Sequence, residues 1–258
     1  MPDLSDAYSN TAHIPGGTAY PARWRAKAAT FRATHPSEIV AYGTGRRETV
    51  RLIAPPGPAQ GTLVFIHGGY WSAFHPDDFS HLAAGALARG WRMALPGYDL
   101  CPSVRISTIT RQIARAVERI ATGGKGPLVL TGHSAGGHLV ARMGCADAAP
   151  DARIARIIPV SPLADLAPLM RTTMNGKLQI DAGEAQAESP VHHPAPATQV
   201  HVWVGAAERP AFLDQARLLA RSWEAPLTLD PGRHHFDVID GCEDPDSPLM
   251  RALLDGVG

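Results

Sequence analysis

The stretch TGHSAGGH, residues 131–138, places one serine between two closely spaced glycines. Gly132 lies two residues before Ser134, and Gly136 lies two residues after it, which is the spacing G-x-S-x-G. In this pattern the chain leaves a strand, turns sharply and enters a helix, and a side chain on either glycine would collide with the turn. A serine held at the apex can attack a carbonyl carbon, so the stretch predicts covalent catalysis by Ser134.

A nucleophilic serine needs a base, an acid that orients the base, and donors for the developing oxyanion. Two later segments supply the first two groups. Residues 200–205 predict a buried strand that is followed by Glu208, and residues 227–230 predict a strand that is followed by His234 and His235. We therefore predict Glu208 as the acid, and one histidine of the pair as the base.

The turn HGGYW, residues 67–71, directly follows the apolar run TLVFI. Glycines let a backbone come close to a substrate oxygen and leave its N–H groups free to point at that oxygen. We expect the oxyanion hole at Gly68, Gly69 and Tyr70, together with the backbone N–H of Ala135 after the serine. The signals for nucleophile, base, acid and oxyanion hole together predict a serine hydrolase.

Composition and charge narrow the functional classes. The chain has 258 residues, of which 45% are apolar, and it carries 24 basic and 24 acidic residues. This balance gives no sign of a nucleic acid or membrane partner. The three cysteines favour neither a disulfide framework nor a zinc knuckle, and no signal peptide or membrane span is evident. We expect a cytoplasmic protein whose partner is a small-molecule substrate, and we leave a homodimer open.

Apolar runs and periodic segments alternate along the chain. Strands are predicted at 38–42, 49–53, 62–67, 91–95, 127–131, 154–161, 199–204 and 227–229, and helices at 20–33, 77–89, 105–122, 138–143, 209–222 and from Pro248. This alternation predicts an α/β fold in one domain, residues 1–258, with a mainly parallel sheet of about eight strands and helices on both faces. Residues 162–198 break the rhythm, and we expect them to form a short cap over the site; a surface excursion without function is the alternative.

Three motifs resemble the kynurenine formamidase (arylformamidase) family of α/β hydrolases, which is akin to the hormone-sensitive-lipase esterases. These motifs are HGGYW, GHSAGGHL and the His-Phe pair at 235–236. The similarity covers most of the chain and includes AYSNTAHIPG (7–16), YDLCP (98–102), DLAPLMRTTMN (165–175), SPVHH (189–193) and VGAAERPAFLDQ (204–215). The resemblance implies the α/β-hydrolase fold and His235 as the base. The family usually has Asp at the position of Glu208, which makes Asp214 a rival for the acid, and a glutamate that stabilises a helix N-terminus is the alternative role of Glu208.

The resemblance also implies a reaction, which is hydrolysis of a formyl or similarly small acyl group from an arylamine, with N-formylkynurenine as the type substrate. A carboxylesterase that acts on small esters is the alternative. A silent ligand-binding protein of this fold would need a broken triad, and this chain keeps all three members. The chemistry requires no cofactor.

Substrate contacts are predicted in the turn and in the cap. Tyr70 and Trp71 are expected beside the acyl group, although Trp71 could equally support the turn from beneath. Arg171 could pair with a substrate carboxylate or face the solvent, and Asn175 would add a polar anchor. The pair His192-His193 lacks an accompanying pattern of metal ligands, so we predict no metal site.

Overall fold

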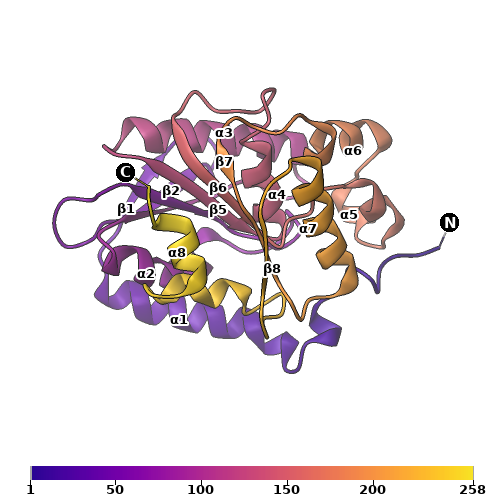
Figure 1. The fold of residues 1–258 in the computed structure, drawn as a ribbon, viewed down its shortest axis with the longest axis horizontal. Helices are drawn as coiled ribbons and strands as arrows, with labels where there is room; N and C mark the ends of the chain where they lie inside the picture. The colour runs from indigo at the N-terminus through magenta and orange to yellow at the C-terminus, as the bar shows by residue number, and fades with distance from the viewer. Residues whose placement is uncertain (1, 258) are drawn as a thin grey trace.

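A computed structural model describes residues 2–257, and within that range the strands form one nine-stranded sheet (Figure 1). The spatial order is β1-β2-β4-β3-β5-β6-β8-β9, and β7 pairs with β6 beside this path. The first two pairings are antiparallel, and all the others are parallel. The strands are β1 (Glu38–Ala41), β2 (Thr49–Ile53), β3 (Thr62–Ile66), β4 (Arg92–Pro96), β5 (Leu128–His133), β6 (Ile154–Val160), β7 (Gln199–Val200), β8 (Val202–Gly205) and β9 (Leu227–Asp230).

Helices cover both faces of this sheet. The α-helices are α1 (Tyr20–Thr34), α2 (Ala83–Ala88), α3 (Ile106–Thr122), α4 (Ala135–Arg142), α5 (Asn175–Leu178), α6 (Ala182–Glu188), α7 (Pro210–Ser222) and α8 (Pro248–Leu254). The 3₁₀ helices are η1 (Thr11–His13), η2 (Gly17–Ala19), η3 (Pro76–Leu82), η4 (Ala167–Arg171), η5 (Pro190–His192) and η6 (Val238–Glu243). Figure 1 shows α1, α2 and α8 together on one side of the sheet, and α3, α4 and α7 lie on the other.

Two hydrophobic cores follow from this layering, one on each face of the sheet. Side chains alternate between the faces along a strand. In β3, Val64 and Ile66 belong to the core under α3, α4 and α7, whereas Leu63 and Phe65 belong to the core under α1, α2 and α8. Because both faces are covered, β3 is buried along its whole length, which explains its continuous apolar run. The predicted mainly parallel sheet with helices on both faces is therefore confirmed.

Two local predictions are wrong. The single strand expected at 199–204 is divided at His201 into β7, which pairs with β6, and β8, which pairs with β9 along its whole length and with β6 at Val160. The helix expected at 77–89 is η3 followed by the short helix α2. In η3 the Asp77 carbonyl accepts hydrogen bonds from the side chains of Arg32 and Ser80, which compete with α-helical bonding.

The insertion at residues 162–198 is ordered and consists of η4, α5, α6 and η5. Buried acceptors on α6 fasten it to α3 and α4. The carboxylate of Glu184 accepts the Ser107 backbone N–H at 2.8 Å, and that of Glu188 accepts the Thr110 hydroxyl at 2.6 Å. His138 Nε2 on α4 donates to the Glu188 carbonyl at 2.7 Å. Among residues 2–257, none of the helices is both long enough and apolar enough to span a membrane.

Enclosed histidines should make the fold sensitive to acid. Burial lowers the pKa of His67 and of His138 to about 3 in each case, from an ordinary value of 6.5. Between these two pKa values, both histidines are protonated in the unfolded chain and neutral in the folded chain. Stability is therefore complete above about pH 6.5 and falls as the pH drops toward 3, by about 1.4 kcal/mol per pH unit for each group.

The substitution His138→Gln tests this expectation, because glutamine can still donate to the Glu188 carbonyl but does not titrate. Urea unfolding at several pH values between about 4.5 and 6 should give a pH slope of the unfolding free energy that is smaller by about 1.4 kcal/mol per unit in the variant. A variant with the same slope as the wild type would show that His138 does not carry this acid sensitivity.

Candidate active site

Ser134 occupies the sharp turn between β5 and α4. Its backbone has φ 58° and ψ −116°, and it is the N-cap residue of α4. A Cβ on Gly132 would collide with the Gly136 carbonyl, and a Cβ on Gly136 would collide with the Ile66 carbonyl. The glycine positions of G-x-S-x-G are therefore required by backbone crowding, and they hold Ser134 in a conformation that L-residues rarely adopt.

The HGGYW turn lies against this serine. A Cβ on Gly68 would be 3.1 Å from the Ser134 Cβ, so the turn passes directly beside the serine side chain. Gly69, Tyr70 and Trp71 follow with φ values of 101°, 49° and 50°. This left-handed run directs the turn around the serine. Across from it, the N–H of Ala135 is at the first position of α4, where a helix offers its N–H groups no internal acceptor.

His235 and Glu208 form a buried contact after β9 and β8. His235 Nδ1 donates to Glu208 Oε2 at 2.6 Å, and both side chains are almost fully buried. The other carboxylate oxygen, Glu208 Oε1, accepts the Ser161 hydroxyl at 2.5 Å and the Gly205 N–H at 2.9 Å. With both oxygens engaged, the carboxylate is fixed in orientation, and the Nε2 atom of His235 is left for the cavity that this residue lines together with Ser134.

Asp214, the rival for the acid, lies elsewhere. Its side chain on α7 is 74% exposed and pairs with Arg217 at 3.3 Å. The structure brings Glu208, not Asp214, to the imidazole of His235. His133, beside the serine, donates from Nε2 to the His235 carbonyl at 2.8 Å and so fixes the backbone of that loop. Burial, followed by the nearby His235, lowers the pKa of His133 well below its usual value, which keeps it neutral.

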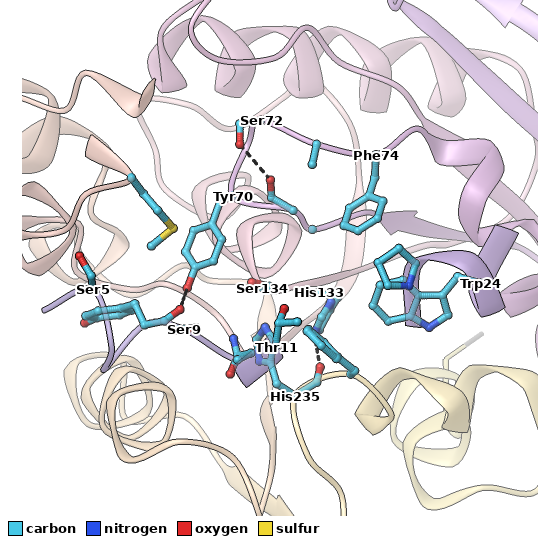
Figure 2. A pocket seen from close by; sticks show the side chains of 18 of the residues that line it. Ser5, Ser9, Thr11, Trp24, Tyr70, Ser72, Phe74, His133, Ser134 and His235 are labelled. Carbon is cyan, nitrogen blue, oxygen red and sulfur yellow. Dashed lines mark hydrogen bonds between the residues drawn. The ribbon is translucent and has the colours of Figure 1, made fainter. Parts of the chain in front are cut away.

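A cavity of about 640 Å³ opens over Ser134 and His235. One part of its wall is aromatic and comprises Trp24, Phe74, Phe79 and Phe236. Another part carries small polar side chains, which are Ser5, Ser9, Asn10 and Thr11. In the view of Figure 2, Trp24 and Phe74 lie on one side of Ser134, and Ser5 and Ser9 lie on the other. The cavity therefore combines an apolar surface with polar groups, as small-ligand sites do.

Four residues are predicted to bind substrate. Three of them, Trp71, Arg171 and Asn175, are absent from the part of residues 2–257 that lines this cavity. Trp71 is fully buried and packs edge-on against His138, with ring centroids 5.0 Å apart, because the left-handed turn directs it into the core. Arg171 donates to the Pro2 carbonyl at 3.0 and 3.2 Å. Asn175 closes a turn inside the insertion through two bonds to Ile180, at 2.8 and 3.0 Å. The predictions for Arg171 and Asn175 are corrected, and for Trp71 the structure shows the alternative, a buried side chain that supports the turn, whereas Tyr70 does line the cavity.

The polar part of the wall comes from the N-terminal strap, which we define as residues 4–13. The sequence predicts no cavity contact in the strap, although the strap supplies more of the wall than the insertion, which contributes Thr173 and Met174. The Tyr70 hydroxyl donates to the Tyr8 carbonyl at 2.6 Å and ties the strap to the HGGYW turn. The motif AYSNTAHIPG marked this segment, but its path depends on contacts between distant parts of the chain that no local pattern encodes.

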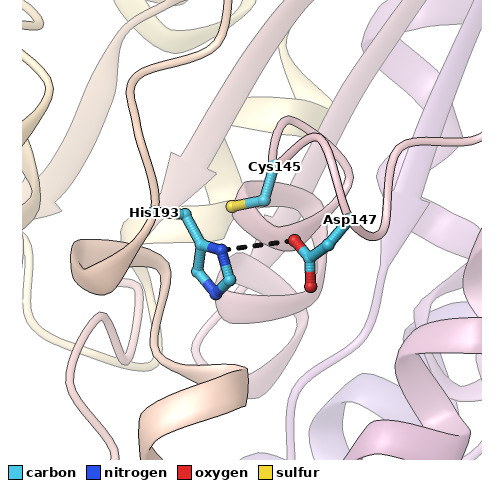
Figure 3. A group of neighbouring side chains, drawn as sticks. All are labelled: Cys145, Asp147 and His193. Atoms are coloured by element: carbon cyan, nitrogen blue, oxygen red, sulfur yellow. Dashed lines mark ion pairs between the residues drawn. The ribbon is translucent and has the colours of Figure 1, made fainter.

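A second group of donor side chains lies near the end of α4 (Figure 3). Cys145, Asp147 and His193 have donor atoms within 4.8 Å of one another. His193 Nδ1 pairs with the Asp147 carboxylate at 3.3 Å, and Arg142 donates two hydrogen bonds to the same carboxylate, at 2.6 and 3.1 Å. Burial raises the pKa of the Cys145 thiol to about 11. Arg142, Asp147 and His193 therefore form an ion-pair network that joins α4 to the insertion.

Comparison with known proteins places the chain in a family. Residues 63–255 match the model of an alpha/beta hydrolase family. The chain belongs to the alpha/beta hydrolases. The fold agrees with that of the esterase from Pyrobaculum calidifontis, which is 16% identical, with a TM-score of 0.71 over 92% of this chain and 91% of the esterase.

The resemblance of this alpha/beta hydrolase to kynurenine formamidases is also confirmed. It is 29% identical over 235 residues to the kynurenine formamidase of Drosophila melanogaster, which covers 82% of this chain and 78% of that protein. The enzyme of the same name from Salmo salar is 26% identical, covering 85% and 81%. A crystal structure from Silicibacter sp. TM1040, of a protein to which a thioesterase activity is attributed, is 49% identical, with a TM-score of 0.95 over 97% of this chain and 98% of that one.

The different surroundings of the two acids predict different effects of their neutralisation. In Glu208→Gln an amide can no longer stabilise an imidazolium, so kcat for p-nitrophenyl acetate should fall on the order of 10³-fold or more. Asp214→Asn should change kcat by less than about twofold, because exposed ion pairs contribute little. Steady-state kinetics of both variants distinguish Glu208 from Asp214 as the acid. A large loss in Asp214→Asn with a small one in Glu208→Gln would contradict the placement of the acid.

Proposed function

We propose that this alpha/beta hydrolase is a serine hydrolase that removes a formyl or similarly small acyl group from an arylamine. The observation that carries the proposal is the arrangement of three side chains. Ser134 and His235 share one cavity, and Glu208 fixes His235 from behind through a buried hydrogen bond of 2.6 Å. Nucleophile, base and orienting acid are then available without a cofactor.

In the first half-reaction, the Ser134 hydroxyl attacks the carbonyl carbon while His235 Nε2 takes its proton. Glu208 keeps the imidazole in the tautomer with hydrogen on Nδ1 and stabilises the imidazolium that forms. The new oxyanion is bound by the N–H of Ala135 and by N–H groups of the turn at Gly68, Gly69 and Tyr70. His235 then returns the proton to the leaving nitrogen, and the C–N bond breaks to release the arylamine.

In the second half-reaction, water replaces the arylamine beside the formyl ester of Ser134. His235 removes a proton from this water, which attacks the ester carbonyl, and the same oxyanion donors stabilise the second tetrahedral intermediate. Collapse of the intermediate breaks the ester bond. The proton returns to the Ser134 oxygen, and formate leaves.

The choice of substrate is supported by the cavity and by the relatives. The aromatic wall at Trp24, Phe74 and Phe236 offers edges and faces to an aryl group. Relatives that share 25–29% identity with this chain are named kynurenine formamidase. An arylamine is also a better leaving group than an alkylamine, which suits a mechanism with one general acid.

A carboxylesterase acting on small acyl esters is the second candidate. It is favoured by the 49% identity to a protein to which a thioesterase activity is attributed. The same Ser134, His235 and Glu208 would serve this reaction, and the leaving group alone would differ. The substrate panel below separates the two activities.

The panel compares kcat/KM for N-formylkynurenine with kcat/KM for p-nitrophenyl acetate, butyrate and octanoate. We expect the formamide to exceed every ester by about tenfold or more, which corresponds to about 1.4 kcal/mol of transition-state discrimination. Ser134→Ala is the control and should lower every rate on the order of 10⁴-fold or more. Activity that rises from acetate to octanoate, without turnover of the formamide, would sink the formamidase proposal and support an esterase.

A further inference from the structure

His234 is the histidine of the pair at 234–235 that the proposed mechanism does not use. It lies in the loop between β9 and η6, directly before the proposed base, His235. Its side chain is partly buried, and His234 is not one of the residues within 2–257 that line the cavity. Both of its ring nitrogens contact polar groups of the protein, so the ring links parts of the protein to one another rather than to a substrate.

The Nδ1 atom of His234 accepts hydrogen bonds from two backbone N–H groups in the turn that carries His235. These are the N–H of Phe236, at 3.1 Å, and the N–H of Asp237, at 3.3 Å. Because the peptide planes fix the directions of both hydrogens, Nδ1 receives them with its lone pair, and the ring proton is on Nε2. A side-chain acceptor that bonds the N–H two residues later is the device by which Asn and Asp stabilise turns, and here a histidine provides it.

The backbone of His234 closes the same turn. Its N–H donates to Asp237 Oδ1 at 2.7 Å, and its carbonyl accepts the N–H of Val238 at 3.1 Å. Asp237 Oδ1 also lies 3.1 Å from His234 Nδ1, but this oxygen is already engaged by the backbone N–H and does not need a proton from the ring. The N–H, the carbonyl and Nδ1 of His234 therefore all stabilise the turn that contains His235.

The other ring nitrogen fastens this turn to the first residue of α1. With the ring proton on Nε2, this atom donates to the Tyr20 hydroxyl at 3.1 Å, and the two rings pack edge to face with centroids 5.4 Å apart. Tyr20 also packs against Phe236, which lines the cavity, with ring centroids 5.2 Å apart. His234 thus holds the turn internally through Nδ1 and anchors it to a helix through Nε2.

We infer that His234 is a positioning residue, whose Nδ1 atom holds the turn that presents His235 to Ser134. This inference rests on the proposed function. Glu208 fixes the imidazole of His235, and His133 bonds the His235 carbonyl, whereas the two N–H groups that follow His235 are bonded by His234. Loss of the acceptor leaves these N–H groups unbonded, and the turn relaxes. A displacement of about 1 Å at a reacting group lowers a rate on the order of 100-fold.

Two substitutions test this role, because each keeps one end of the ring. In His234→Asn the carboxamide oxygen replaces Nδ1 but does not reach Tyr20, so kcat for p-nitrophenyl acetate should stay within about threefold of the wild type. In His234→Gln the amide N–H reaches Tyr20 but the δ position has no acceptor, so kcat should fall by about tenfold or more. KM should change by less than about threefold in both variants, because His234 is not part of the cavity wall within residues 2–257.

His201→Leu is the matched control for lost stability. His201 is also a partly buried histidine, its Nε2 bonds the Thr228 hydroxyl at 2.8 Å, and it is not among the cavity-lining residues of the described chain, 2–257. This variant should have a lower melting temperature and an unchanged kcat, with all rates measured well below the melting temperature of each variant.

The outcomes separate this inference from the proposed function. A His234→Asn variant as slow as His234→Gln, or a His234→Gln variant as fast as His234→Asn, would overturn the positioning role while the proposed function stands. If Ser134→Ala hydrolyses p-nitrophenyl acetate as fast as the wild type, the proposed function fails, and the positioning role of His234 fails with it.

Discussion

The close approach of the end of β3 to the start of α4 is the constraint on which the whole site depends. Gly136 has no room for a Cβ because the Ile66 carbonyl occupies that space, and Gly68 passes within contact distance of Ser134. The serine is further held by its N–H, which donates to the Val160 carbonyl at 2.9 Å. These contacts stabilise a backbone conformation that costs about 1–3 kcal/mol on its own, and they put the glycine-rich turn beside the serine.

Three further loops complete the site around Ser134. The loops after β8 and β9 bring Glu208 to His235, and Ser161 after β6 fixes the far oxygen of the carboxylate. The N-terminal strap then crosses the same edge of the sheet and is tied to Tyr70 and Arg209, which lie in two of these loops. A substrate in the cavity would therefore touch a wall whose position depends on the same loops that hold Glu208 and the HGGYW turn.

Some residues of this site can be predicted from the sequence, and others cannot. Ser134, Glu208 and His235 could be found because each follows a predicted strand, and the carboxyl ends of parallel strands meet at one edge of a sheet. The inward orientation of the Trp71 side chain cannot be predicted, because it depends on three consecutive left-handed residues in the turn. The expected role of Arg171 rests on its charge and its place in the cap segment, but its partner is the distant backbone carbonyl of Pro2. Likewise, no local pattern shows that the strap reaches the cavity.

Covalent labelling by a serine-directed phosphonate tests the central claim most directly, namely that Ser134 is activated by His235. Peptide mass mapping locates the adduct, and the second-order rate constant reports activation of the nucleophile independently of any substrate. The account predicts a single adduct on Ser134 in the wild type and labelling of His235→Gln that is slower on the order of 10³-fold or more. An adduct on another residue, or a variant that is labelled as fast as the wild type, would contradict it.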